Sequence, residues 1–275
     1  MNAFTVDVEE WFHICGVGGP LARHKWHDLP SRVEETTTRL LDELDAAGVT
    51  ATFFVLGWVA SRYPGLVTRI QTAGHSIASH GYWHQRVYEL GPAGFSADLA
   101  ESVRALTAAG VDRVSAFRAP EWSLNTTTPW AFDILAEHGV TLDCSMAPVR
   151  IVGDPGYPRT PHRRRVEHGS IIEVPPFVTD RFGHALPLGW GWALRRATPR
   201  SVARAIEQAN RQGRPAVLTV HPWEIDAAPP RVRLPLRLHV AHYFRLSGFL
   251  DRLRTVLRTV PFSTLDAVAR SAPPL

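Results

Sequence analysis

Residues 33–56 read VEETTTRLLDELDAAGVTATFFVL, and this stretch joins a helix to a strand. Apolar residues recur at helical spacing over residues 33–47, and Gly48 follows as a glycine typical of a helix end. Residues 49–56 are rich in β-branched and aromatic side chains, which favours a strand. The stretch therefore predicts one helix followed directly by one strand.

The same alternation continues on both sides of this stretch. Ser31 and Glu34 have the spacing of a capping box and indicate where the helix begins. Repeated strand–helix units imply a mainly parallel sheet with helices outside it, and either an α/β barrel or an open doubly wound sheet fits. Further strands are expected at residues 3–8, 75–79, 114–117, 140–144, 171–174 and 216–220, and further helices at 59–73, 95–109, 129–138 and 199–212.

Three segments depart from this alternation. Residues 16–30 and 147–169 are long and irregular, and loops of this length in a compact domain are usually functional or mobile. After Pro222 the pattern changes to a proline-rich loop, a helix near residues 243–257 and a short tail at 262–269.

Composition limits the class of protein. The 275 residues carry 30 basic and 26 acidic side chains, a net charge of +4 that is too small to indicate nucleic-acid binding. A hydrophobic share of 45% and a charged share of 20% are typical of a soluble globular protein. Two cysteines, Cys15 and Cys144, exclude a disulfide framework and a four-thiolate zinc site.

The start of the chain and the length of its apolar runs predict its location in the cell. The start of the chain lacks the basic and apolar regions of a signal peptide. No uncharged apolar run reaches the roughly 18–20 residues of a membrane span. We therefore expect a cytoplasmic protein without stable membrane insertion.

Polar side chains gather where the expected strands end. In parallel α/β folds the chemistry lies at the C-terminal ends of the strands. Five of these ends carry carboxylates, imidazoles or a guanidinium, in the motifs DVEEW (7–11), SHGYWH (79–84), RAPEW (118–122), DCS (143–145) and HPWE (221–224).

His80 and His84 are candidate metal ligands. Four residues apart, they can face one ion from the same side of a turn, although two surface histidines in a polar loop would look the same. A carboxylate from Asp7, Glu9 or Glu10 would complete a catalytic zinc pattern. Alternation along an extended strand end places Asp7 and Glu9 on one side and Glu10 on the other.

Arg118 and His221 are candidates for supporting roles. A guanidinium at the end of a strand can fix a carboxylate by two parallel bonds, or can be an ordinary surface arginine. His221 follows a strongly apolar strand and is either a hydrogen-bonded core residue or, with Asp143 nearby to orient it, a general acid.

Aromatic and basic side chains near the motifs are candidates for substrate binding. We expect the tryptophans in and near the motifs either to stack on sugar rings or to fill the core, with Trp190 and Trp192 the more exposed pair. The basic run from Arg159 to Arg165 has two interpretations: the favoured one is a solvated loop, and the other is a clamp for a phosphate or uronate on the substrate. The candidates are Trp83, Trp122, Trp190, Trp192, Trp223, Arg163 and Arg164.

Together, in this order, the five motifs resemble those of polysaccharide deacetylases, the NodB-type enzymes of carbohydrate esterase family 4. The resemblance covers about residues 3–225. HPWEID (221–226) and AHYFRL (241–246) resemble a subgroup linked to exopolysaccharide loci with exosortase systems. The resemblance implies a distorted (β/α)7-type barrel with a C-terminal helical extension, divided into a catalytic domain at 1–225 and an extension packed on it at 226–275.

The resemblance also implies an activity and a set of roles. The activity is metal-dependent hydrolysis of N-acetyl groups from amino sugars of a polysaccharide, an oligosaccharide or a precursor, with Zn²⁺ or else Co²⁺, Ni²⁺ or Mn²⁺. Asp7 would be the base held by Arg118, and His221 the acid tuned by Asp143. His80, His84 and Glu9 would bind the metal. Where the family usually has a second aspartate, this chain has Val8, so Glu9 takes that role.

Two other functions remain open at this point. One is an amidohydrolase for a cyclic imide or ureide on the same scaffold. The other is a non-catalytic saccharide-binding module. If the protein is a deacetylase, we expect a backbone N–H near Glu121 or Trp122 to stabilise the oxyanion of the tetrahedral intermediate.

Overall fold

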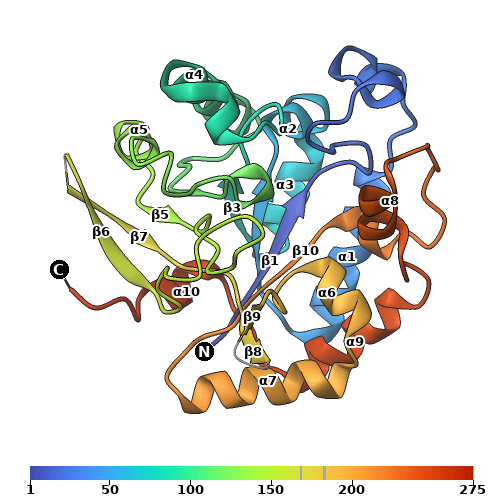
Figure 1. The fold of residues 1–275 in the computed structure, drawn as a ribbon. Helices are drawn as coiled ribbons and strands as arrows, with labels where there is room; N and C mark the ends of the chain where they lie inside the picture. The colour runs from blue at the N-terminus through green and yellow to red at the C-terminus, as the bar shows by residue number, and fades with distance from the viewer. Residues whose placement is uncertain (168, 182–183, 275) are drawn as a thin grey trace.

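Eight strands form one curled sheet at the centre of the computed structural model, which describes residues 1–167, 169–181 and 184–274 (Figure 1). Neighbouring strands are parallel except for the last pair, which is an antiparallel hairpin. The expected barrel-type α/β class is confirmed, as an open half-barrel. The order is β10 (Val217–Val220), β1 (Ala3–Val8), β2 (Thr52–Val55), β3 (Ser76–Ser79), β4 (Ala116–Phe117), β5 (Leu142–Asp143), β7 (Gly169–Glu173) and β6 (His162–Val166).

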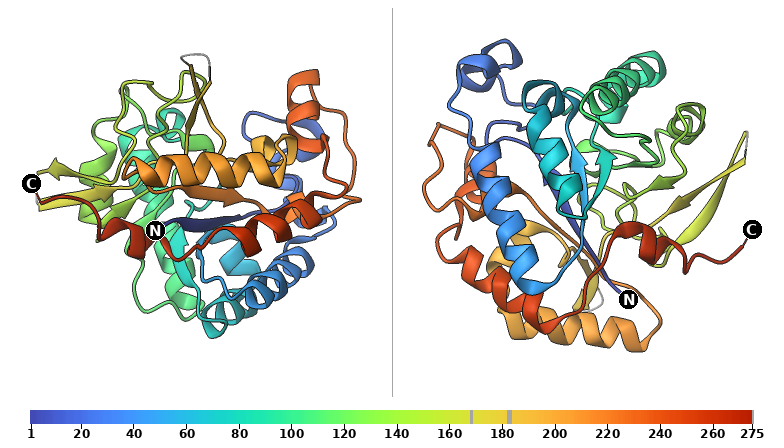
Figure 2. Two further views of the ribbon diagram at one scale, coloured as in Figure 1. Left: turned by 90° about the horizontal axis from the view of Figure 1, so that it is seen from below. Right: turned by 180° about the vertical axis from the view of Figure 1, so that it is seen from behind.

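Helices surround this sheet, and their apolar faces bury the strands (Figure 2). β1, β2 and β10 are buried along their whole length, as expected of parallel strands covered on both faces. The helices are α1 (Val33–Ala47), α2 (Gly57–Arg62), α3 (Pro64–Thr72), α4 (Val87–Ala108), α5 (Ala131–Glu137), α6 (Gly191–Arg196), α7 (Pro199–Arg211), α8 (Leu236–Tyr243), α9 (Phe249–Thr259) and α10 (Leu265–Ala269).

The expected C-terminal helical extension is present. After residue 225 the chain forms α8, α9 and α10. Helix α9 packs against α1 and α7, and α10 packs against β1. None of the helices among the described residues is both long and apolar enough to cross a membrane.

Irregular chain covers the outer edge of β10. Thr219 donates its N–H to the Gly189 carbonyl at 2.7 Å, and Phe177 donates its N–H to the Val217 carbonyl at 3.1 Å. Gly189 in turn donates to the Phe177 carbonyl at 2.9 Å. These bonds satisfy backbone groups that an open edge would leave unpaired. They also fix the segment that leads from the edge of the sheet into α6.

Several local expectations need correction. Ser31 does not cap α1: the N-cap residue is Arg32, whose side chain makes no capping bond, and the Ser31 hydroxyl donates to the Glu10 carboxylate. The helix expected at residues 59–73 is two helices, α2 and α3, because Pro64 starts a new one. The helix expected near residues 243–257 is also divided: Tyr243 ends α8, and α9 begins at Phe249 after Gly248, which has a positive φ of 70°.

One strand lies inside a segment expected to be irregular. Residues 162–166 form β6, which pairs with β7 at the outer edge of the sheet. Their side chains alternate between half-buried and exposed, so the arginine-rich run hides a strand of period two.

The covered edge of β10 gives a first prediction. A Cβ on Gly189 would lie 2.6 Å from the Val217 carbonyl oxygen and 2.9 Å from the Phe177 carbonyl oxygen, both backbone atoms. Gly189→Ala should therefore lower the free energy of unfolding by about 1–3 kcal/mol, the usual effect of overpacking. Urea unfolding measures this directly.

Gly65 in α3 is the matched control, because a Cβ there meets nothing within 4 Å. Gly65→Ala should leave stability unchanged or raise it by up to about 1 kcal/mol. Equal stabilities for the two variants would contradict the close approach at Gly189.

Candidate metal centre and active site

A cleft of about 370 Å³ opens at the C-terminal ends of the strands. It brings together side chains that follow β1, β3, β4 and β10. Another hollow, of about 550 Å³ between α7 and α9, is lined by none of the expected site residues. The cleft is lined by Asp7, Glu9, His13, Ile14, His80, His84, Ala119, Glu121, Trp122, Ile151, Val152, Trp190, Gly191, Trp192, Arg195, His221, Trp223, Glu224, Leu238, Ala241 and His242.

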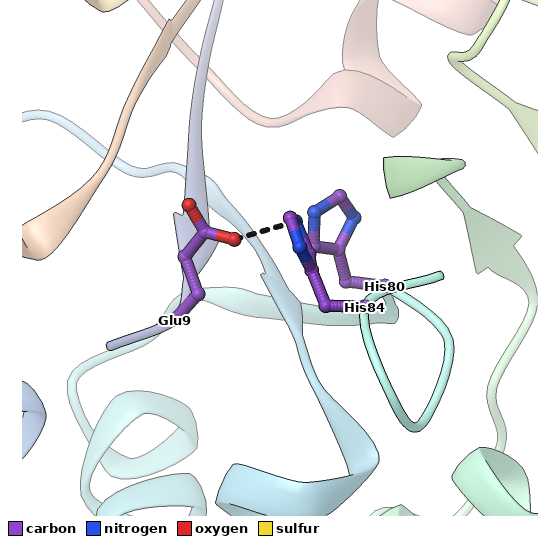
Figure 3. A group of neighbouring side chains, drawn as sticks. All are labelled: Glu9, His80 and His84. Atoms are coloured by element: carbon purple, nitrogen blue, oxygen red, sulfur yellow. Dashed lines mark ion pairs between the residues drawn. The ribbon is translucent and has the colours of Figure 1, made fainter. Parts of the chain in front are cut away.

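Glu9, His80 and His84 converge in this cleft (Figure 3). Each offers one ligand atom, and these atoms lie within 4.8 Å of one another. All three side chains are buried. Glu9 follows β1, whereas both histidines lie in the turn after β3. The backbone of His84 adopts a positive φ of 52°, a strained conformation that suits a residue held for function.

Hydrogen bonds to neighbouring groups orient the side chains of this group, as is usual for metal ligands. The Nδ1 of His80 lies 2.8 Å from the Arg118 carbonyl, which leaves Nε2 directed at the group. The Oε2 of Glu9 lies 2.7 Å from His84 Nε2 but is buried without a well-formed hydrogen bond. Two imidazoles and a carboxylate are a donor set that zinc and related divalent metals accept. The three residues therefore fit a metal ion.

Burial and mutual charge set the protonation of these groups. Burial lowers the pKa of His80 to about 4, so its imidazole is neutral and able to bind a metal at neutral pH. Burial by itself would raise the pKa of Glu9, but the His84 and His221 imidazoles hold it below its usual range. Burial opposes a charge on His84, yet Glu9 and Cys15 raise its pKa well above the usual value.

Asp7 is fixed by a fully buried guanidinium. Arg118 donates from NH1 to the Asp7 carboxylate at 2.6 Å and to the Thr5 hydroxyl at 2.9 Å. The rings of Phe54 and Trp122 lie 4.1 Å and 4.6 Å from its carbon Cζ. The second carboxylate oxygen of Asp7 faces His221 Nε2 at 4.0 Å. One oxygen of Asp7 is thus held, and the other points toward the site.

His221 takes its orientation from Glu224, three residues later. Its Nδ1 lies 3.0 Å from Glu224 Oε2, which also accepts the His221 backbone N–H at 3.0 Å. Arg195 lies beneath this pair, with Nε 2.9 Å from Glu224 Oε1. Burial disfavours a charge on His221, but Glu9 and Glu224 raise its pKa to about 9.

The expected pairing of Asp143 with His221 is absent from the described hydrogen bonds and ion pairs. Asp143 instead accepts bonds from the hydroxyl and the backbone N–H of Ser145, at 2.7 Å and 3.1 Å. The last residues of β5 direct it toward Glu173 on β7. Burial and the Asp143 carboxylate raise the pKa of Glu173 well above its usual range, so Glu173 holds a proton between the two acids.

The tryptophans divide between the core and the cleft. Trp190 was expected to be exposed but is buried, because its ring stacks on Trp122 with centroids 5.5 Å apart. Trp192 is exposed as expected. Trp223 lies between the rings of His221 and His242, and its Nε1 donates to Glu9 at 3.2 Å. Trp83 is not among the side chains that line the cleft.

Arg163 and Arg164 lie away from the cleft. Both belong to β6, on the hairpin that projects from the side of the molecule opposite α8 (Figures 1 and 2). Arg164 lies over the Phe132 ring at 4.2 Å, and Arg163 is exposed. The structure does not bring this pair to the proposed metal ligands.

Sequence reasoning missed four cleft residues: Glu224, Arg195, His13 and His242. Glu224 could have been found, because it lies three residues after His221, the N-cap residue of the short helix η4 (Pro222–Ile225). Arg195 lies between the strand expected at residues 171–174 and the helix expected at 199–212, where the sequence analysis assigned no element. His13 and His242 carry no local motif, and each has a buried Nε2 without a hydrogen-bond partner among the described residues.

Two backbone N–H groups were considered for stabilising the oxyanion. The N–H of Trp122 already donates to the Ala119 carbonyl at 3.1 Å, which leaves the N–H of Glu121.

Comparison with known proteins agrees with a polysaccharide deacetylase domain. Residues 25–142 match the family model described as polysaccharide deacetylase, and residues 144–270 match a domain of unknown function, DUF3473. The first region contains His80, His84 and Arg118, whereas Asp7 and Glu9 precede it. Residues 25–142 are thus similar to the polysaccharide deacetylase family, and the region that follows them is similar to DUF3473.

Curated relatives are similar over short segments. A peptidoglycan-N-acetylglucosamine deacetylase of Bacillus cereus is 46% identical over 50 residues, which is 18% of each chain. A chitin deacetylase of a Pestalotiopsis species is 36% identical over 92 residues, or 32% of this chain and 31% of that protein. The matched segments thus span less than a third of these relatives.

Solved structures match over nearly the whole chain. A structure from Mycobacterium smegmatis, described as a polysaccharide deacetylase, is 25% identical over 98% of this chain and 88% of its own, with a TM-score of 0.61. A CE4 family pseudoenzyme from Bacillus anthracis is 14% identical over 100% of this chain and 66% of its own, with a TM-score of 0.52. The second likeness concerns the fold alone.

The acid pair at β5 and β7 gives a second prediction. Folded Glu173 keeps a proton that the unfolded chain releases above about pH 4.3. The free energy of unfolding therefore falls as pH rises above this value. Glu173→Gln removes this pH-dependent loss of stability, because an amide does not titrate. The amide can also keep the contacts of Glu173, since it can accept from the Met146 N–H, as Glu173 does at 2.9 Å, and can donate to Asp143.

We expect Glu173→Gln to be more stable than the parent by at least about 1 kcal/mol at pH 7 and equally stable near pH 4. Urea unfolding of both proteins at the two pH values provides the measurement. A stability difference that is the same at both pH values would show that Glu173 is ionised in the folded protein.

Proposed function

We propose that this protein is a metal-dependent N-deacetylase that removes acetyl groups from amino sugars of a saccharide and releases acetate. The observation that carries the proposal is the convergence of Glu9, His80 and His84 beside the Asp7–Arg118 pair and His221. The polysaccharide deacetylase match over residues 25–142 supports the same activity. The catalytic domain would comprise residues 1–225, with residues 226–275 as an extension packed on it.

The metal would be held by Glu9, His80 and His84. When bound, a divalent metal such as Zn²⁺, Co²⁺, Ni²⁺ or Mn²⁺ polarises an amide carbonyl and lowers the pKa of a coordinated water. His80 is kept in the correct tautomer by the Arg118 carbonyl. Trp223 fixes the other oxygen of the Glu9 carboxylate through its indole N–H.

Asp7 and His221 would move the protons. Arg118 holds one oxygen of Asp7, so the other accepts the proton of the attacking water as the new C–O bond forms. His221 has its Nδ1 held by Glu224, so Nε2 donates a proton to the leaving nitrogen as the C–N bond breaks. The 4.0 Å between Asp7 Oδ2 and His221 Nε2 places both groups at one point in the cleft.

The substrate would be an N-acetylated saccharide whose rings stack on the aromatic side of the cleft. Trp192 is the exposed indole at its rim, and Trp122 and Trp223 line it. The exopolysaccharide-linked subgroup remains our proposal for the biological setting, and its two motifs fall inside the DUF3473 region. Because Arg163 and Arg164 lie on β6 away from the cleft, their action as a phosphate or uronate clamp is proposed only for a part of the substrate that extends outside the cleft. A cytoplasmic location is also a proposal.

His80→Ala and Asp7→Asn separate metal binding from proton transfer. His80→Ala should lose bound metal and acetate release together, because it removes a ligand. Asp7→Asn should keep the metal but lose about 10²–10⁴-fold in rate, because it removes the base. Metal analysis and acetate release from N-acetylglucosamine oligomers measure the two quantities, and a fully active Asp7→Asn enzyme would disprove the role of Asp7.

Glu224→Gln and Asp143→Asn distinguish the two proposed partners of His221. Glu224→Gln should lower kcat by about 10²-fold with KM and metal content little changed, because His221 loses a charged partner at 3.0 Å. Asp143→Asn should leave kcat within about tenfold of the parent, because its carboxylate contacts Ser145. A larger loss of kcat in Asp143→Asn than in Glu224→Gln would return the orienting role to Asp143.

A further inference from the structure

An unpartnered apolar face lies on α8 beside the mouth of the cleft. Leu236, Val240 and Phe244 are spaced four residues apart and thus share one side of this helix and its end. Trp192 on α6 and Ile151 extend the same surface. Their exposed fractions are large for apolar side chains: Leu236 79%, Ile151 72%, Val240 43%, Phe244 42% and Trp192 38%. Exposed apolar surface of this kind commonly marks an interaction site.

Arginines border this face without acidic neighbours in the same segment. Residues 227–250 contain four arginines and two histidines but no aspartate or glutamate. Arg237 and Arg196 line the same groove as Val240 and Phe244, and the Arg196 guanidinium lies 5.4 Å from the Phe244 ring. Neither arginine takes part in an ion pair among the described residues. The combination of apolar side chains and free positive charge matches an anionic lipid surface.

The groove is continuous with the cleft. It has a volume of about 380 Å³ and shares Ile151, Trp192, Arg195 and Ala241 with the cleft lining. A surface that binds at α8 would therefore lie at the cleft entrance. Helix α8 is on the side of the molecule opposite the β6–β7 hairpin (Figures 1 and 2).

We infer that this face, defined by Ile151, Trp192, Leu236, Val240 and Phe244 with Arg196 and Arg237, docks on the surface of an anionic lipid bilayer. The apolar side chains enter the boundary between headgroups and acyl chains, and the arginines contact lipid phosphates. The cleft then opens toward the membrane, where a saccharide carried by a lipid is within reach. Docking itself does not depend on the proposed deacetylase activity, whereas this choice of substrate does.

Buried Arg195 connects the docking face to the catalytic histidine. Its NH1 donates to the carbonyls of His242 and Phe244, at 3.1 Å and 2.7 Å, and its NH2 donates to that of Ala241. Its Nε faces Glu224, which holds His221. One side chain therefore contacts both the end of α8 and Glu224, the residue that holds His221, and this links the face to the site.

Vesicle co-sedimentation of the full chain tests the docking. Vesicles of phosphatidylcholine mixed with phosphatidylglycerol should bind the protein, and vesicles of phosphatidylcholine alone should bind it far less. Leu236→Ser with Val240→Ser should weaken binding at least about tenfold, because two side chains no longer enter the boundary region. Arg237→Gln should weaken it about fivefold. Blue-shifted fluorescence of Trp192, judged against Trp192→Phe, should accompany binding.

Two matched controls lie elsewhere on the surface. Leu186→Ser on β9 (His184–Leu186) removes a leucine that is 40% exposed, close to the 43% of Val240, and Arg211→Gln removes an exposed arginine of α7. Both should bind vesicles like the parent chain, and thermal unfolding should show every variant folded. The inference is overturned if anionic vesicles do not bind the parent, or if the controls weaken binding as much as the α8 variants. It is also overturned if the face instead forms a dimer that Leu236→Ser with Val240→Ser dissociates.

Discussion

A guanidinium without solvent contact holds the site together. Arg118 directly follows β4 with its side chain fully buried, and a buried charge is strongly unfavourable unless it is paired and hydrogen-bonded. Asp7, Thr5 and Cys144 accept its N–H bonds, so the ends of β1 and β5 are drawn to it. Its own carbonyl orients His80. One residue therefore positions the proposed base and one proposed metal ligand together, and loss of the Asp7 carboxylate would leave an uncompensated buried charge.

A second buried arginine plays the corresponding part on the other side of the cleft. Arg195 pairs with Glu224, and Glu224 holds His221. Gly191 permits this, since a Cβ there would lie 1.8 Å from a Glu224 oxygen. The two arginines thus fix the proposed base and acid from opposite sides, through one carboxylate each. The base and the acid are thus held by two distant parts of the chain. One part is the early strands, and the other is the segment after residue 186.

Much of the fold could be predicted from the sequence, because its central elements have strong local signals. β1, α1 and α7 were expected almost at their observed bounds, from apolar runs, helical spacing and glycines at helix ends. β6 was missed because an arginine-rich edge strand lacks an apolar face. The positions of His80 and His84 and of an early carboxylate at strand ends predicted that they would meet, whereas Glu9 was selected from these carboxylates through the family resemblance. Glu224 could have been found as the partner of His221 from their spacing of three residues, whereas the orientation of Asp143 toward Glu173 depends on the pairing of β5 with β7. The burial of Trp190 depends likewise on its distant neighbour Trp122.

The central claim is that Glu9, His80 and His84 bind one catalytic divalent metal for the removal of acetyl groups. The most direct test is a titration of the metal-free protein with Zn²⁺, in which bound metal and acetate release from N-acetylglucosamine oligomers are followed together. We predict that activity is absent without metal and rises in proportion to bound metal up to one ion per chain. Full activity in the metal-free protein, or one tightly bound ion that leaves acetate release at zero across a panel of N-acetylated saccharides, would contradict the claim.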